Sequence, residues 1–187
     1  MITNDIQLVI DSLQENKVVC IPTDTVFGLA VSYNKEGFET LKKIKNRENK
    51  PFSLLVKDLK MLKKYCVVDN KAQKIINTFL PGALTIVLPS LNNETIGIRI
   101  IDHHFIKTIF EQIDFPLYLT SANLSGEPLL NSLEEIEKVF PDVLIINSNH
   151  LNGMPSTVVK QDKDNLLLLR EGSIPFCDIL NIWKETK

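Results

Sequence analysis

Apolar residues recur along this chain with two different periods. A spacing of three and four residues, typical of one buried helix face, runs through residues 6–13 behind a capping Asn4 or Asp5. The same spacing follows Asn34, a second capping residue. On this basis helices are predicted at 6–13, 34–44, 59–65, 71–80, 105–113, 133–140 and 177–183.

Short apolar runs between these segments have the length and composition of strands. Strands are predicted at 18–21, 53–56, 84–88, 96–100, 117–119, 143–146, 157–160 and 166–170. The last two are separated by a polar turn at 161–165, which predicts a hairpin. Alternating helices and strands predict an α/β fold, and the hairpin predicts a mixed rather than an all-parallel sheet.

The chain of 187 residues is expected to form one domain, because no linker, repeat or low-complexity segment divides it. Its apolar runs are far shorter than the ~20 residues of a membrane helix, and its first residues do not resemble a secretory signal. Three widely spaced cysteines, Cys20, Cys66 and Cys177, argue against a disulfide framework or a zinc site. A cytoplasmic location without membrane contact is the expectation.

Charge is unevenly distributed, although the net charge is only −2. Residues 35–74 contain twelve basic and five acidic residues, a local balance of +7. Such a segment could face a polyanion such as ATP or RNA. The alternative is a solvated helix face, and this reading is favoured for Lys60, Lys63 and Lys64, since exposed base-stacking aromatics are not interleaved with them.

Arginine is rare here, with three residues against eighteen lysines. Arg47, Arg99 and Arg170 each lie in a short segment rich in apolar residues, proline or glycine. A guanidinium binds phosphate or carboxylate with two parallel hydrogen bonds, which an ammonium does not. The three segments therefore predict an anion site, with ordinary ion pairs as the alternative.

Polar motifs lie at the ends of predicted strands. They occupy residues 22–28, 120–126 and 153–157, and ligands of α/β proteins usually bind where such loops converge. Any one of these loops alone could be a turn or a cap. Gly28, Gly126 and Gly153 lie in these motifs, and Gly97 inside a strand indicates a close backbone approach or a bulge.

Other familiar constellations are missing from the sequence. It contains neither a G-x-x-x-x-G-K-[ST] phosphate loop nor a G-x-G-x-x-G fingerprint. His103 and His104 are adjacent and predict a surface or helix-start role rather than a metal pair, while His150 stands alone. Asp24 could orient Thr25 or a water molecule, but the commoner role of Asp in such a turn is to accept local backbone N–H groups.

Taken together, seven segments resemble the YrdC/TsaC family of threonylcarbamoyl-AMP synthases. In chain order they are Pro-Thr-Asp-Thr-Val-Phe-Gly-Leu, Lys-Asn-Arg with Lys-Pro, Pro-Gly-Ala-Leu-Thr, Ile-Gly-Ile-Arg, Thr-Ser-Ala-Asn-Leu-Ser-Gly, Pro-Ser-Thr-Val and Leu-Arg-Glu-Gly. The resemblance covers about residues 18–174 and implies a YrdC-like single domain over residues 1–187. It implies a twisted mixed β-sheet flanked by helices, with a concave, positively charged face.

The resemblance also implies a reaction. L-threonine and bicarbonate or CO2 form N-carboxythreonine, which attacks the α-phosphorus of ATP and releases pyrophosphate. Mg2+ is expected to arrive with ATP, held mostly by phosphates and water. The product would pass to a downstream transferase complex that modifies tRNA, and weak binding of tRNA or double-stranded RNA is a further possibility.

Site residues follow from matching the family motifs position by position. The resemblance implies a catalytic group of Lys45, Arg47, Ser121 and Asn123. It implies ATP binding by Arg47, Lys50, Thr95, Asn123 and Arg170. It implies threonine binding by Thr25, Arg99, Ser121 and Ser156, with Arg99 on the carboxylate.

Three departures from the family pattern bear on these expectations. Phe27 stands where tyrosine is usual, Glu48 stands where proline is common, and the chain ends at Lys187, so the extra domain of longer relatives is expected to be absent. Two rival functions are an RNA-binding module and a carbamoyl-transfer component like the related domain of hydrogenase-maturation enzymes. The second depends on acylphosphatase and zinc-finger segments that this sequence does not contain.

Overall fold

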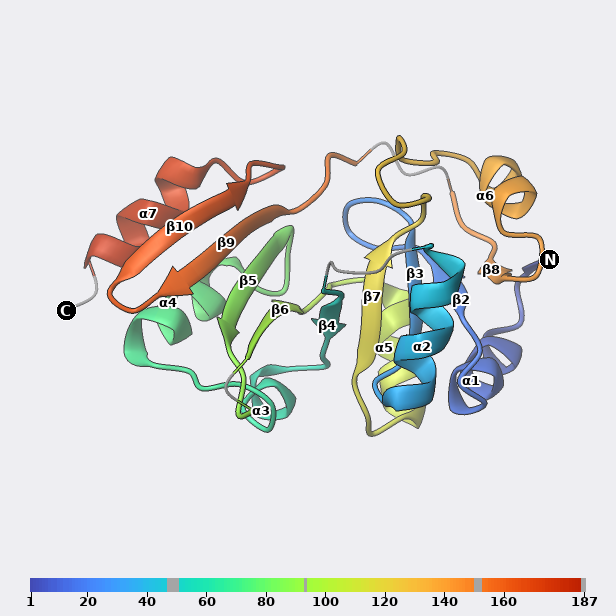
Figure 1. The fold of residues 1–187 in the computed structure, drawn as a ribbon, viewed down its shortest axis with the longest axis horizontal. Helices are drawn as coiled ribbons and strands as arrows, with labels where there is room; N and C mark the ends of the chain where they lie inside the picture. The colour runs from blue at the N-terminus through green and yellow to red at the C-terminus, as the bar shows by residue number, and fades with distance from the viewer. Residues whose placement is uncertain (47–50, 93, 150–152, 186–187) are drawn as a thin grey trace.

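The computed structural model describes residues 1–46, 51–92, 94–149 and 153–185, which form a ten-stranded mixed sheet with helices on both faces (Figure 1). The strands are β1 (Ile2–Thr3), β2 (Val19–Ile21), β3 (Gly28–Ser32), β4 (Ser53–Leu55), β5 (Leu84–Pro89), β6 (Thr95–Arg99), β7 (Leu117–Ser121), β8 (Leu144–Ile146), β9 (Thr157–Asp162) and β10 (Asn165–Arg170). The helices are α1 (Ile6–Gln14), α2 (Lys35–Ile44), α3 (Leu59–Leu62), α4 (Asn70–Phe79), α5 (His104–Gln112), α6 (Leu133–Val139) and α7 (Phe176–Glu185).

The strand order is β1-β8-β2-β3-β7-β4-β6-β5-β9-β10. Four pairs of the described strands are parallel (β1 with β8, β2 with β8, β4 with β6, β5 with β9) and five are antiparallel, which confirms the predicted mixed sheet. The predicted hairpin is confirmed as well, because β9 and β10 pair antiparallel with Asp162 opposite Asn165.

Two strands were not predicted from the sequence. Strand β3 lies between β2 and β7 near the middle of the sheet, and all five of its residues are buried. It has no polar–apolar alternation, and it begins at the glycine that ends a polar motif, so the sequence did not separate it from that loop. Strand β1 has only two residues, too few to show any period.

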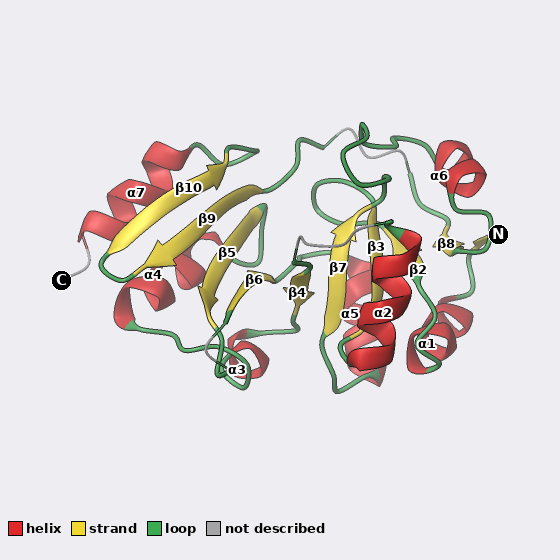
Figure 2. Ribbon diagram, viewed as in Figure 1, coloured by secondary structure: helices red, strands yellow, loops and turns green. Residues whose placement is uncertain are grey.

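The two faces of the sheet have separate hydrophobic cores. Alternate side chains of β2 divide between them, with Val19 and Ile21 in one core and Cys20 in the other. Helices α1, α3, α4, α5 and α7 contribute to the first core, and α2 and α6 to the second, so coverage is unequal (Figure 2). No helix of the described residues therefore contributes to the second face over β6, β5, β9 and β10.

Helix starts follow the predicted capping residues. Asp5 Oδ1 accepts hydrogen bonds from the backbone of Gln7 (2.9 Å) and Leu8 (3.2 Å), and Asn34 Oδ1 accepts one from Gly37 (2.9 Å). His103 caps α5 by accepting from the Phe105 N–H through Nδ1 at 3.3 Å, which confirms its predicted helix-start role.

Three lysines of the basic segment are exposed, as the sequence predicts. Lys60, Lys63 and Lys64 are exposed, so the prediction of a solvated face is confirmed for these three residues. Among the described helices, none has both the length and the apolar character needed to cross a membrane.

Candidate active site

A cavity of about 440 Å³ lies on the face of the sheet that helices leave open. Its floor is made by alternate residues of adjacent strands, as the period of two requires: Thr85 and Val87, Thr95 and Gly97, Val158 and Lys160, and Leu169. A Cβ at Gly97 would lie 3.1 Å from Thr85 Cγ2 and 3.3 Å from Ser53 Oγ. The strand is regular there, so the predicted close approach is confirmed and a bulge is not.

Six of the residues predicted for the site line this cavity. They come from five separate segments of the chain: Thr25, Thr95, Arg99, Ser121, Ser156 and Arg170. Lys45 and Asn123 are not among the lining residues, and Arg47 and Lys50 lie outside the described residues. The sequence motifs therefore converge in space around one described cavity.

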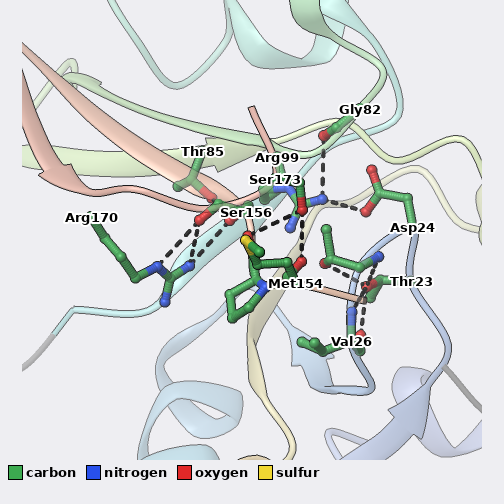
Figure 3. A network of polar contacts seen from close by, with 12 residues as sticks. Thr23, Asp24, Val26, Gly82, Thr85, Arg99, Met154, Ser156, Arg170 and Ser173 are labelled. Carbon is green, nitrogen blue, oxygen red and sulfur yellow. Dashed lines mark hydrogen bonds and ion pairs between the residues drawn. The ribbon is translucent and has the colours of Figure 1, made fainter. Parts of the chain in front are cut away.

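Arg99 is the buried cation of the cavity, with 5% of its surface exposed. Its Nη2 forms an ion pair with Asp24 Oδ1 and donates to the carbonyl of Gly82 at 3.3 Å (Figure 3). Nε is buried and has no partner among the described residues. Burial lowers the pKa of Arg99, and the adjacent Asp24 carboxylate opposes that shift.

The loop after β2 is shaped by Thr23, which the sequence analysis did not single out. Its Oγ1 accepts from the N–H groups of Thr25 and Val26, both at 3.1 Å, and donates to the Val26 carbonyl at 2.5 Å. The prediction that Asp24 serves local N–H groups is therefore wrong. The Thr23 hydroxyl accepts these N–H groups instead, and the Asp24 carboxylate pairs with Arg99.

The loop before β9 is held against both sides of the cavity. Ser156 Oγ lies 2.8 Å from Thr85 Oγ1, and the Ser156 carbonyl accepts from Arg170 Nε (3.2 Å) and Nη2 (2.8 Å). Burial and the positive charge of Arg99 lower the pKa of Arg170, so the two cations repel and an anion between them would be stabilised. A Cβ at Gly153 would fall 1.6 Å from the Thr25 carbonyl oxygen, so this loop packs directly on the Thr23–Val26 loop.

A third cluster joins α2 to the end of β7. Lys45 is 1% exposed, and its Nζ donates to the carbonyls of Ser121 (2.9 Å) and Asn123 and to Asn123 Oδ1 (3.1 Å). Ser121 Oγ donates to the same Oδ1 at 2.6 Å, and Asn123 Nδ2 donates to the Glu127 carbonyl at 2.6 Å. The ammonium thus fixes the 121–123 loop, of which Ser121 reaches the cavity wall.

Comparison with known proteins decides the family. The model of the family named for Sua5, YciO and YrdC, described as "Telomere recombination", matches residues 11–172. The chain belongs to the Sua5/YciO/YrdC family. A putative threonylcarbamoyl-AMP synthase of Methanocaldococcus jannaschii is 37% identical over 171 residues, which cover 85% of this chain and 81% of the relative.

Solved structures of the Sua5/YciO/YrdC family have the same fold. P. abyssi Sua5 complexed with L-threonine has a TM-score of 0.89 at 25% identity, covering 97% of this chain and 58% of that one. E. coli YciO has a TM-score of 0.83 at 24% identity, covering 94% and 95% of the two chains, and shows the fold alone. The chain spans 56% of the Bos taurus and 55% of the Bacillus subtilis threonylcarbamoyl-AMP synthases.

Three residues of this Sua5/YciO/YrdC family member contact predicted site residues but were not themselves predicted as site residues. Thr23 and Asp24 lie in the first family motif, and Thr85 ends the Pro-Gly-Ala-Leu-Thr motif. Their places in the motifs were the available signal, but their partners lie far along the chain, up to 75 residues away for Asp24. Phe27, which replaces the usual tyrosine, is 1% exposed and packs in the second core beside the cavity wall.

Proposed function

We propose that this protein is a threonylcarbamoyl-AMP synthase, which forms L-threonylcarbamoyl-AMP and pyrophosphate from L-threonine, bicarbonate or CO2, and ATP. One observation carries the proposal: the family motifs converge on a single cavity that contains the buried Arg99, the exposed Arg170 and several hydroxyl groups. The M. jannaschii relative, similar over most of both chains, bears the name of this activity.

The threonine end of the site is assigned to Thr25, Arg99, Ser121 and Ser156. Arg99 offers the unpartnered Nε donor and a permanent charge, which together suit an α-carboxylate. The buried hydroxyls of Thr25 and Ser156 lie in the same cavity and suit hydrogen bonds to the amino acid. The L-threonine complex of P. abyssi Sua5, a structural relative, supports threonine as the substrate.

The nucleotide end is assigned to Arg47, Lys50, Thr95, Asn123 and Arg170. Of these, Thr95 and Arg170 line the cavity at the ends of β6 and β10. The catalytic group is assigned to Lys45, Arg47, Ser121 and Asn123. Within it Lys45 supports the 121–123 loop, because its ammonium donates to two carbonyl oxygens and one side-chain oxygen of that loop.

The chemistry needs positive charge more than it needs a covalent intermediate. The threonine amine loses a proton and forms a C–N bond to CO2. One carbamate oxygen then attacks the α-phosphorus while the bond to the β-phosphate oxygen breaks and pyrophosphate leaves. Two anions meet in this step, so fixed cations and aligned donors lower the barrier. Among the described residues no group of three acidic, histidine or cysteine side chains could hold a metal, and Mg2+ is proposed to bind through the ATP phosphates.

The remaining parts of the proposal follow from this activity. A positively charged concave face is proposed, supported by Arg99, Lys160 and Arg170 on the cavity wall. Residues 1–187 are proposed to act as one domain, in the cytoplasm, where ATP and tRNA are present. A downstream tRNA threonylcarbamoyl transferase complex would consume the product, and weak tRNA or double-stranded RNA binding remains part of the proposal.

Pyrophosphate release from MgATP tests the proposal, measured with and without L-threonine and with and without bicarbonate. Wild-type protein should release pyrophosphate only when both are present, and Arg47→Ala and Arg170→Gln should release at least tenfold less. Lys138→Gln, an exposed residue of α6, is the matched control and should behave as wild type. Folded protein that binds ATP but shows no threonine-dependent release would contradict the synthase assignment and favour an RNA-binding module or a carbamoyl-transfer component.

A further inference from the structure

We infer that Asp24 is a positioning residue for the amino-acid substrate, acting on the substrate carboxylate through Arg99. The inference rests on the proposed function. Asp24 touches Arg99 and, unlike Arg99, is not one of the described residues that line the cavity. Its effect on a ligand must therefore pass through the guanidinium.

The hydrogen bonds of Arg99 divide its donors into two sets. Nη2 carries both described contacts, one to Asp24 Oδ1 and one to the Gly82 carbonyl at 3.3 Å. Nε and Nη1 have no hydrogen bond to any described residue, and Nε is buried. Nε–H and Nη1–H point to different edges of the guanidinium and cannot form a two-point fork for one carboxylate, so a substrate carboxylate would take a single hydrogen bond from a donor that Asp24 leaves open, together with the charge of Arg99.

The position of Asp24 is fixed by hydrogen bonds within its own loop, independently of Arg99. It lies between Thr23 and Thr25 in the loop that the Thr23 hydroxyl closes on itself, and its side chain is only 15% exposed. The second contact of Arg99 Nη2 comes from the Gly82 carbonyl, and the Gly82 N–H in turn donates to the Ile100 carbonyl at 3.1 Å. Two segments of the chain therefore hold Nη2, and these contacts favour one orientation of the guanidinium.

The charge of Asp24 has two opposing effects on the binding of a substrate carboxylate. The Asp24 charge repels a substrate carboxylate, and the same charge stabilises and orients a cation that would otherwise be buried alone. A buried guanidinium without its counter-ion is free to turn toward other acceptors, and the loss of its fixed orientation outweighs the relief of repulsion. The structure therefore favours weaker threonine binding when Asp24 is neutralised.

Calorimetric titration of L-threonine into wild type, Asp24→Asn, Arg99→Lys and the double variant is the test. Asp24→Asn should raise the L-threonine Kd on the order of tenfold, comparable to the loss of metal affinity when a carboxylate that orients a metal ligand is removed. In the Arg99→Lys background the same change should alter Kd by less than twofold, because its route to the substrate is gone. Asp102→Asn is the control. Asp102 is an exposed aspartate three residues after Arg99 and pairs with Lys107, so its substitution should leave the L-threonine Kd unchanged.

Each outcome decides a different point. An unchanged or tighter L-threonine Kd in Asp24→Asn, or an equal effect in the Arg99→Lys background, overturns the inference. Asp24→Glu gives a second comparison that retains the charge, so its Kd should lie closer to wild type than that of Asp24→Asn, and equal Kd values would also count against the inference. Threonine binding without pyrophosphate release would contradict the proposed function and leave the inference to these Kd values, whereas a wild type that does not bind threonine would overturn both.

Discussion

Lys45 and Asn123 are separated by 78 residues in the sequence and are joined by two hydrogen bonds inside the protein. The Lys45 ammonium donates to the carbonyls of Ser121 and Asn123 and to Asn123 Oδ1, while Ser121 lines the cavity. A lysine expected on phosphate is thereby connected to the loop that carries two other predicted site residues. The role proposed for Lys45 in catalysis therefore includes support of this loop as well as charge.

Lys45→Met is expected to destabilise the fold and to abolish activity together. The change removes three hydrogen bonds of the buried ammonium, among them the one described for the Asn123 carbonyl, and an unpaired buried acceptor costs roughly 1–3 kcal/mol. The urea midpoint should fall, and pyrophosphate release should drop at least tenfold. Lys43→Met, an exposed lysine of α2, is the matched control, and equal urea midpoints for the two variants would contradict the prediction.

Thr85→Val is expected to weaken threonine binding more than nucleotide binding. The substitution keeps the shape of the side chain and removes the hydroxyl that lies 2.8 Å from Ser156 Oγ. Loss of one buried hydrogen bond costs about 1 kcal/mol, which corresponds to a several-fold rise in the KM for L-threonine. Steady-state assays varying each substrate separately measure this. Thr78→Val, in the exposed part of α4, serves as control, and a larger rise in the KM for ATP would speak against the assignment of Ser156 to threonine.

Gly153→Ala is expected to disable the site by displacing a loop. The added methyl would fall 1.6 Å from the Thr25 carbonyl oxygen, so the 153–157 segment or the Thr23–Val26 loop must move. Activity should fall at least tenfold, since small displacements of positioning groups have large effects on rate. Gly126→Ala provides the comparison, because that glycine has φ +89° and open space around it. It should cost about 1 kcal/mol of stability and little activity, and similar activity in both variants would refute the packing argument.

The three cysteines are expected to differ sharply in reactivity toward a thiol reagent. Burial raises the pKa of Cys20 far above its ordinary range and that of Cys66 to about 11, whereas Cys177 is exposed. The thiolate is the reactive form, so at pH 8 native protein should be labelled once, at Cys177, and unfolded protein three times. Mass spectrometry of the labelled chain counts the adducts, and rapid modification of Cys20 in native protein would contradict the structure.

The raised pKa values of Cys20 and Cys66 predict how the free energy of unfolding depends on pH. A thiol whose pKa is higher in the folded than in the unfolded state binds its proton more tightly when folded. Its contribution is complete below the ordinary pKa of 9.0 and is lost as pH rises toward the folded value. The free energy of unfolding should therefore fall between pH 9 and 11, and Cys66→Ala should fall less steeply than wild type over that range. Identical slopes would argue against burial of the Cys66 thiol.

Local features were predictable from the sequence, and contacts between distant segments were not. Capping residues, the β9–β10 hairpin and the close approach at Gly97 depend on neighbouring residues or on the absence of a side chain, and the structure has each of them. Strand β3 was missed because a fully buried strand carries no alternation. The ion pair of Asp24 with Arg99 was missed because nothing near Asp24 in the sequence indicates a partner 75 residues away.

The strand order has a practical consequence for altering this protein. The segment between β8 and β9 connects the second strand of the sheet to the ninth and so crosses six strands, with Gly153 pressed on Thr25 and Ser156 on Thr85 along the way. Length added or removed near 153–157 would shift both halves of the cavity at once. The β9–β10 turn is exposed at Lys163 and Asp164, which are not among the described residues that line the cavity. This turn is therefore the better place for an inserted tag, a fluorophore or new chain ends.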